Sequence, residues 1–240
     1  MWYEFFSSDP GRQFLTFSVL HFFIIAFTTM ACAIIIFFRK ALQELPINNI
    51  LPKVFAAILF INMAVFYIGY LLTGSYDITL HLPLQFCYVT GYLFIYMLWF
   101  NKPKMYNFLF YSIFMCTLVT LIWAPPLNSF DRIQFYQFWI SHSGLLIMNF
   151  YAFYVLNLPV NKKGVLWALI YSVGLFIFAS IFNRIFGTNY IFSEEIPEYL
   201  LELYPFLDHI SYPIILLALG WIGSVAIAYL LVRLKAKSDK

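Results

Sequence analysis

Apolar residues along the chain are grouped into seven runs, each long enough to cross a lipid bilayer as a helix. A helix needs about 20 apolar residues to span the hydrocarbon core, and inside lipid a helix satisfies its own backbone hydrogen bonds. The pattern therefore predicts an all-α, polytopic membrane protein in which a single domain of seven transmembrane helices occupies residues 1–240. The predicted spans are 14–38, 51–72, 81–100, 105–123, 133–157, 164–186 and 209–233.

The composition agrees with this prediction, and the charges orient the chain. Hydrophobic residues make up 63% of the sequence and charged residues only 10%, with a mean hydropathy of +0.82, which is unlike an ordinary soluble domain. Eleven of the fourteen Lys and Arg residues lie on one predicted side of the membrane, and nine of the eleven acidic residues lie on the other. The positive-inside rule then predicts an N-terminus outside the cell and a cytoplasmic C-terminus.

The segments between the spans limit the classes of function. A net charge of +3 gives no reason to expect a nucleic-acid partner, and the short cytoplasmic turns leave no room for a nucleotide-binding domain. We therefore expect the functional site at the outer face. The longest connection, 187–208, includes an acidic stretch from Glu194 to Asp208 that predicts a short amphipathic helix on the membrane surface. The N-terminus lacks a basic region, so no signal-peptide cleavage is expected.

The third apolar run opens with the segment His81-Leu-Pro-Leu-Gln-Phe-Cys87. Proline suits the first turn of a helix, where its missing N–H is not needed. The helix is therefore predicted to begin near Pro83 and to continue to about Phe100. Cys87 would then lie about one turn inside the membrane, where a thiol can reach the ester region of a lipid.

All four histidines fall in the outer half of the predicted bundle, in the same layer as Cys87. His142, in the fifth run, has a predicted depth similar to that of Cys87. Because the thiolate is the nucleophilic form of cysteine, an attacking Cys87 needs a neighbouring base, and His142 is the candidate. The alternatives are structural. Cys87 with Thr90 and Gly91 forms a small-residue packing face, and His142 with Asn149 has the spacing of an interhelical hydrogen-bonding face.

The other histidines have weaker functional signatures. His21 shares a helical stripe with Thr28 and Cys32, which favours a contact between helices. His81, at the start of the third run, indicates a contact with lipid headgroups or a plain interface position. His209 opens the last run, where helix capping and binding of a phosphate headgroup are both open.

No metal or cofactor motif is present in the sequence. Cys32, Cys87 and Cys116 lie in apolar runs without CxxC spacing, so a disulfide framework is not expected. A zinc site built from His21, Cys87 and His142 would have no recognisable spacing. HExxH, GxSxG and glycine-rich phosphate loops are also missing. We therefore expect no cofactor and no metal.

Three short motifs resemble the YwaF-type integral membrane proteins, a family that includes the animal transmembrane protein 164. They are Leu82-Pro-Leu-Gln-Phe-Cys87 in the third run, Ser141-His142 in the fifth and Gly187-Thr-Asn-Tyr190 after the sixth. The resemblance implies a cysteine-dependent acyltransferase that moves a fatty acyl chain between phospholipids, with Cys87 and His142 as the motif cysteine and histidine. It also implies that Asn189 and Tyr190 shape the mouth of a pocket.

The sequence therefore predicts a lipid acyltransferase of the bacterial cell membrane that works through an acyl thioester on Cys87, with His142 as its base. Asn149 or Asn189 is predicted to hold the imidazole or the developing oxyanion. The alternatives are a transporter of solutes or lipids with an outward-facing polar cavity, and a receptor without chemistry. Membrane phospholipids are the expected partners, and the oligomeric state is left open. The predicted supporting residues are His21, His81, Asn149, Asn189, Tyr190 and His209.

Overall fold

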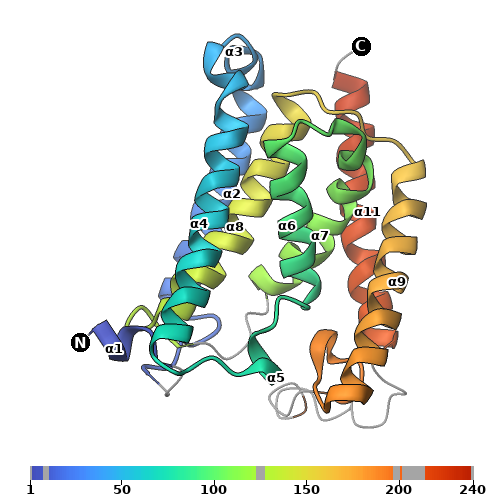
Figure 1. Ribbon diagram of the computed structural model, residues 1–240. Coiled ribbons are helices and arrows are strands. Elements are labelled where there is room, and N and C mark those ends of the chain that lie inside the picture. The colour runs from blue at the N-terminus through green and yellow to red at the C-terminus, as the bar shows by residue number, and fades with distance from the viewer. Residues whose placement is uncertain (1, 8–10, 123–127, 197–200, 202–213, 239–240) are drawn as a thin grey trace.

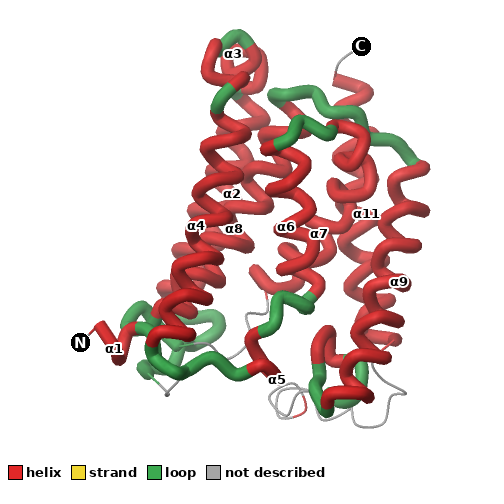
Figure 2. Tube along the Cα trace, in the orientation of Figure 1, coloured by secondary structure: helices red, strands yellow, loops and turns green. Residues whose placement is uncertain are grey.

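The computed structural model describes residues 2–7, 11–122, 128–196, 201 and 214–238, and within these ranges every regular element is a helix (Figures 1 and 2). The predicted all-α class is confirmed. The long helices are α2 (Val19–Phe37), α4 (Leu51–Leu72), α6 (Phe86–Trp99), α7 (Tyr106–Ile122), α8 (Ile133–Tyr154), α9 (Lys163–Phe186) and α11 (Ile214–Ser238). The short elements are α1 (Trp2–Phe5), α3 (Arg39–Gln43), η1 (Pro46–Asn49), α5 (Ile78–His81), η2 (Pro103–Met105) and η3 (Tyr190–Phe192).

Four helical segments of the described chain are long and apolar enough to cross a bilayer. Helix α9 leaves most of its apolar surface uncovered by the rest of the protein, because only 11% of its most apolar window is buried. Helix α1 and the C-terminal end of α11 lie at opposite ends of the bundle (Figure 1). The structure therefore confirms a helical membrane protein, while the count of seven spans stays a prediction. The four segments are Val19–Phe37, Leu51–Leu72, Pro103–Ile122 and Lys163–Phe186.

Helix α7 is the centre of one half of the bundle, since α6, α8, α9 and α11 all pack against it. In the other half, α2 and α4 pack against α8, and α4 also packs against α6. Figure 1 shows the result: α2, α4 and α8 form one group, α7, α9 and α11 form another, and α6 lies between them. The site described below lies where α4, α6 and α8 meet.

The start of the third long helix differs from the prediction. The chain forms the separate short helix α5, ending at His81, and α6 begins only at Phe86. Asp77 caps α5 through a 2.7 Å hydrogen bond from the Thr79 N–H. Leu82 is extended (φ −63°, ψ 144°) because it precedes Pro83, whose ring disfavours the helical conformation there. The expectation that Pro83 lies in the first turn of this helix was therefore wrong, and Cys87 is the second residue of α6.

Two predictions fall on parts of the chain outside the described residues. The amphipathic helix expected between Glu194 and Asp208 falls largely on residues 197–200 and 202–213. His209 lies in the second of these ranges.

Candidate functional site

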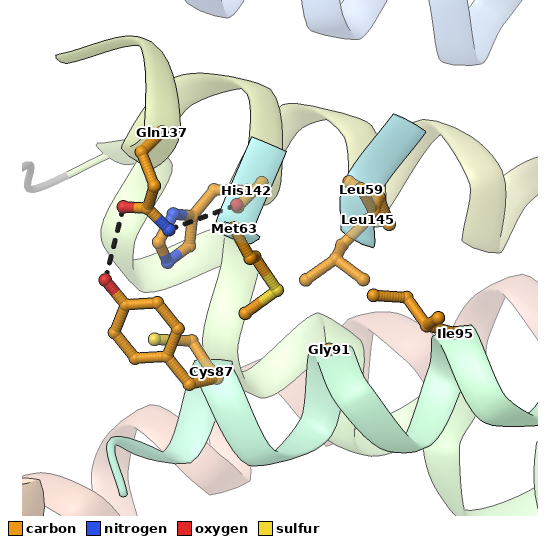
Figure 3. A pocket seen from close by; sticks show the side chains of 10 residues that line it. Leu59, Met63, Cys87, Gly91, Ile95, Gln137, His142 and Leu145 are labelled. Carbon is orange, nitrogen blue, oxygen red and sulfur yellow. Dashed lines mark hydrogen bonds between the residues drawn. The ribbon is translucent and has the colours of Figure 1, made fainter. Parts of the chain in front are cut away.

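Cys87 and His142 line the same cavity, which is enclosed by α4, α6 and α8 (Figure 3). In Figure 3 the sulfur of Cys87 points from α6 toward the imidazole that α8 supplies. The cavity measures about 10 Å³, which is room for roughly one water molecule. His142 is buried and Cys87 is half-buried. The lining residues are Leu59, Met63, Cys87, Tyr88, Gly91, Ile95, Gln137, Ser141, His142 and Leu145.

The imidazole of His142 is held in one orientation by its own helix. Its Nδ1 lies 2.8 Å from the carbonyl oxygen of Phe138, one turn earlier on α8, and the Phe138 ring packs on it with centroids 4.2 Å apart. A carbonyl oxygen can only accept, so the neutral imidazole carries its proton on Nδ1. The other nitrogen, Nε2, is buried and has no hydrogen-bond partner, not even Cys87. The structure therefore places an unused basic nitrogen at the cavity.

Cys87 lies in the first turn of α6, where backbone N–H groups point out of the helix. Gln85, the residue at the cap position, makes no side-chain capping bond to the helix. Its side-chain oxygen instead accepts a 2.9 Å bond from the Ile191 N–H. The N-terminus of α6, whose N–H groups receive no bond from the Gln85 side chain, therefore lies at the residue that carries the thiol.

The loop after α9 is folded around Asn183, which is buried. The side-chain oxygen of Asn183 accepts from the Tyr190 N–H at 2.9 Å and from the Thr188 hydroxyl at 2.6 Å. Its amide nitrogen donates to the Tyr190 carbonyl at 2.8 Å and to the Ser193 hydroxyl at 2.8 Å. Gly187 makes the turn possible because its φ of +65° lies in the left-handed region. One amide thus fixes the position of the whole loop.

This loop holds the segment that leads into α6. The buried Tyr190 hydroxyl accepts a 2.9 Å bond from the Leu82 N–H and donates to the Ile78 carbonyl at 2.5 Å. Together with the bond from Ile191 to Gln85, these contacts fasten the loop to both ends of the stretch between α5 and α6. Tyr190 therefore supports the start of the Cys87 helix and does not itself line the cavity.

A hydrogen-bonded network that sequence reasoning missed lies beside the cavity. The Tyr88 hydroxyl donates to the Gln137 side-chain oxygen at 3.2 Å, and the Gln137 amide nitrogen donates to the Ser141 hydroxyl at 3.3 Å (Figure 3). Asn62 on α4 also donates to the Ser141 hydroxyl, at 3.1 Å. A signal was available, since Gln137 lies four residues before Ser141, on the same face of the helix, and Ser141 directly precedes His142. The network links α4, α6 and α8 around the two candidate residues.

Comparison with known proteins adds a family to this geometry. The family model described as the TMEM164 family matches residues 15–231. The chain belongs to the TMEM164 family. An uncharacterized protein of Treponema pallidum (strain Nichols) is a relative that is 26% identical over 203 residues, which cover 83% of each chain. No solved structure matches. Family membership and the apolar helices together identify an integral membrane protein.

Within this TMEM164-family chain, His21 and Asn149 lie away from the cavity and link helices. His21 Nδ1 accepts from the Phe17 N–H at 2.9 Å, and its Nε2 donates to the Leu121 carbonyl on α7 at 2.8 Å. Asn149 donates to the Phe110 carbonyl at 3.3 Å, and its side-chain oxygen accepts from the Tyr106 hydroxyl at 2.9 Å. These bonds pair the polar atoms of both side chains with other groups of the protein. The Phe138 carbonyl, not Asn149, orients His142.

Asn189 and His81 lie in two segments at one end of the bundle, the loop after α9 and the helix α5. The Asn189 side-chain oxygen accepts from the Glu194 N–H at 3.2 Å, so Asn189 stabilises its own loop. His81 Nδ1 accepts from the Asp77 N–H at 2.8 Å, and its ring packs against Tyr70 and Tyr76 with centroids 4.8 and 5.8 Å apart. Burial among these rings lowers the pKa of His81. Neither residue lines the cavity.

Proposed function

We propose that this protein is a membrane-embedded, cysteine-dependent acyltransferase that acts on the acyl chains of phospholipids through an acyl-thioester intermediate. One observation supports it most strongly: Cys87 and the free Nε2 of His142 share one cavity within the membrane bundle. A buried basic nitrogen without a partner costs free energy, about 1–3 kcal/mol for an unbonded polar group. This cost is explained if the Nε2 atom of His142 accepts a proton from a donor during a reaction.

In the first half of the proposed reaction, His142 Nε2 takes the proton of the Cys87 thiol, and the sulfur attacks the carbonyl carbon of a phospholipid ester. The carbonyl electron pair moves to oxygen and forms a tetrahedral oxyanion. When the pair returns, the bond between the carbonyl carbon and the glycerol oxygen breaks. The leaving oxygen takes the proton from His142, which releases a lysophospholipid and leaves the acyl chain on Cys87.

In the second half, the hydroxyl of an acceptor lysophospholipid gives its proton to His142 Nε2 and attacks the thioester. The carbon–sulfur bond breaks, and the sulfur recovers its proton from the imidazolium. The acyl chain has then moved from one phospholipid to another, with the enzyme returned to its starting state. The Nδ1 proton of His142 remains bonded to Phe138 throughout, because the carbonyl favours the protonated nitrogen at every step.

The membrane arrangement that accompanies this proposal has seven spans, with the N-terminus outside and the C-terminus in the cytoplasm. The cavity lies near the start of α6, so the ester would come from the outer leaflet. A volume of about 10 Å³ is too small for an ester group, and access therefore requires α4 to move away from α6 near Met63. A bacterial relative supports placing the protein in a bacterial cell membrane.

The test is acyl transfer by the purified protein in vesicles of phosphatidylethanolamine and phosphatidylglycerol, with one phospholipid carrying a labelled acyl chain. The wild-type protein is expected to move label between the two lipid classes. Cys87→Ser and His142→Gln should lose most of this transfer, whereas Cys116→Ser, which removes another thiol of the bundle, should retain it. Normal transfer by the Cys87→Ser protein would exclude the thioester mechanism. Movement of labelled lipid across the bilayer without a change in its mass would indicate a transporter.

A further inference from the structure

A second buried polar atom without a hydrogen-bond partner lies near Cys87. It is the hydroxyl oxygen of Tyr67 on α4. Native proteins rarely leave a buried polar atom unbonded, because its lost contact with water is then uncompensated. A phenylalanine would fill the same space without this cost. The hydroxyl of Tyr67, unlike its ring, is therefore unexplained by packing.

Tyr67 lies one helical turn beyond the cavity on α4, on the side toward α5, and is not one of the residues that line it. It follows Met63 by one turn on the same face of α4, and Met63 lines the cavity. The Tyr67 ring packs against Tyr88 with centroids 6.2 Å apart and against Tyr76 with centroids 6.3 Å apart. Tyr88 directly follows Cys87 and lines the cavity as well. The ring contact with Tyr88 joins Tyr67 to the residue next to Cys87.

The neighbouring polar groups do not use this hydroxyl. Tyr88 donates its own hydroxyl proton to Gln137 at 3.2 Å, and Gln137 continues the network to Ser141 at 3.3 Å. Tyr67 is outside this network, so its O–H is available as a donor next to Tyr88. An ester carbonyl that reaches Cys87 through the seam between α4 and α6 passes this hydroxyl, because Tyr67 and Met63 lie on the α4 side of the seam.

We propose that the Tyr67 hydroxyl donates a hydrogen bond to the carbonyl oxygen of the bound phospholipid ester and to the oxyanion that forms when Cys87 attacks. This inference rests on the proposed function. As the sulfur–carbon bond forms, negative charge gathers on the carbonyl oxygen, and the fixed O–H dipole stabilises that charge. When the glycerol oxygen leaves, the electron pair returns to the carbonyl. Tyr67 keeps its proton throughout, so His142 remains the only base.

The test compares Tyr67→Phe with the wild-type protein in vesicles of phosphatidylethanolamine and phosphatidylglycerol. The turnover number should fall by about 100-fold, as when an oxyanion donor is removed, with little change in the apparent KM. Alkylation of Cys87 by iodoacetamide should keep its wild-type rate, because that reaction forms no oxyanion. Tyr96→Phe is the matched control, since Tyr96 is 45% exposed on α6 and away from the cavity.

The outcomes separate this inference from the proposed function. If wild-type protein acylates Cys87 and Tyr67→Phe turns over at the wild-type rate, Tyr67 has no such role and the proposed function stands. If turnover and alkylation fall together, Tyr67 positions the thiol, and the oxyanion role is overturned. If wild-type protein never carries an acyl group on Cys87, the proposed function fails and the role of Tyr67 fails with it.

Discussion

The Nδ1 atom of His142 lies 2.8 Å from the carbonyl oxygen of Phe138, one turn earlier on the same helix. Because this carbonyl can only accept, the bond fixes the tautomer of the neutral ring and leaves Nε2 unprotonated at the cavity. The orienting partner belongs to α8 itself, so the orientation does not depend on a neighbouring helix. His21 is the opposite case, because both of its ring nitrogens are already bonded.

Replacing His142 should remove activity with little effect on folding. We expect His142→Gln to lower acyl transfer by about 100- to 10,000-fold, which is the usual contribution of a positioned general base. Cys87 alkylation at neutral pH should also slow, since the thiol loses its proton acceptor. Labelled-lipid transfer and thermal unfolding of the same preparation provide the two measurements. A His142→Gln protein with ordinary transfer would contradict the assignment of the base.

Replacing His21 should lower stability and leave activity unchanged. His21→Phe leaves the part-buried Phe17 N–H and the buried Leu121 carbonyl without their partner, and a buried unbonded group costs about 1–3 kcal/mol. We therefore expect a clearly lower thermal unfolding temperature and a normal turnover number per folded molecule. A folded His21→Phe protein as inactive as His142→Gln would show that His21 takes part in the chemistry.

The loop after α9 provides a comparison between two asparagines. Asn183→Ala removes four hydrogen bonds from a buried site, so the loop should loosen and stability should fall by about 2–4 kcal/mol. Asn189→Ala, in the same loop, removes only exposed contacts and should have a small effect. Hydrogen exchange at residues 187–193 measures the loosening. Equal exchange in the two variants would contradict the role given to Asn183.

The segment around α5 should respond to pH through His81. Burial against Tyr70 and Tyr76 lowers the pKa of this histidine below its usual 6.5, so the unfolded chain binds the proton more readily than the folded one. The stability that His81 contributes is therefore present above pH 6.5 and is lost as the pH falls toward the lowered pKa. Asp77 does not share this window, because hydrogen bonds from Thr79 lower the pKa of its carboxyl from 3.8.

This pH dependence is measured by thermal unfolding at pH 7.5 and pH 5.5. The wild-type protein should lose more stability on acidification than His81→Gln, which has no titrating ring. An equal loss in the two proteins would show that His81 does not carry the effect.

Entry of a lipid ester between α4 and α6 requires space at Met63. Met63→Phe adds bulk to a cavity of about 10 Å³, so we expect slower Cys87 alkylation and slower lipid transfer. The matched control is Met30→Phe, because Met30 is 56% exposed on the surface of α2. Unchanged alkylation of the Met63→Phe protein would contradict access through the seam between α4 and α6.

The sequence predicted the helices well because apolar length alone determines where a chain can cross lipid. It also predicted that Cys87 and His142 would lie at one level, since depth follows from position along a helix. It failed at the start of α6, where Asp77 and the bonds from Tyr190 stabilise a separate α5. The Tyr190 contacts join residues more than 100 positions apart and leave no local pattern. The Asp77 cap and the step from Leu82 to Pro83 are local signals that the prediction did not use.

The supporting residues were predicted less well for the same reason. Asn149 has helical spacing to His142, but its partners, Tyr106 and Phe110, are on α7. Nothing in the sequence of α8 shows which helix a polar side chain will meet. Gln137 was missed although its spacing to Ser141 was visible in the sequence. Tyr67 was missed because the sequence does not show whether the neighbours of a buried hydroxyl can bond to it.

The most direct test of the account is to look for the acyl group on Cys87. Wild-type protein is incubated with phosphatidylethanolamine and phosphatidylglycerol vesicles, quenched in acid, digested and measured by mass spectrometry. The account predicts a fatty acyl mass on the peptide that contains Cys87, removable by hydroxylamine, and greatly reduced in His142→Gln. Acyl transfer by wild-type protein with no acyl group ever found on Cys87 would contradict it.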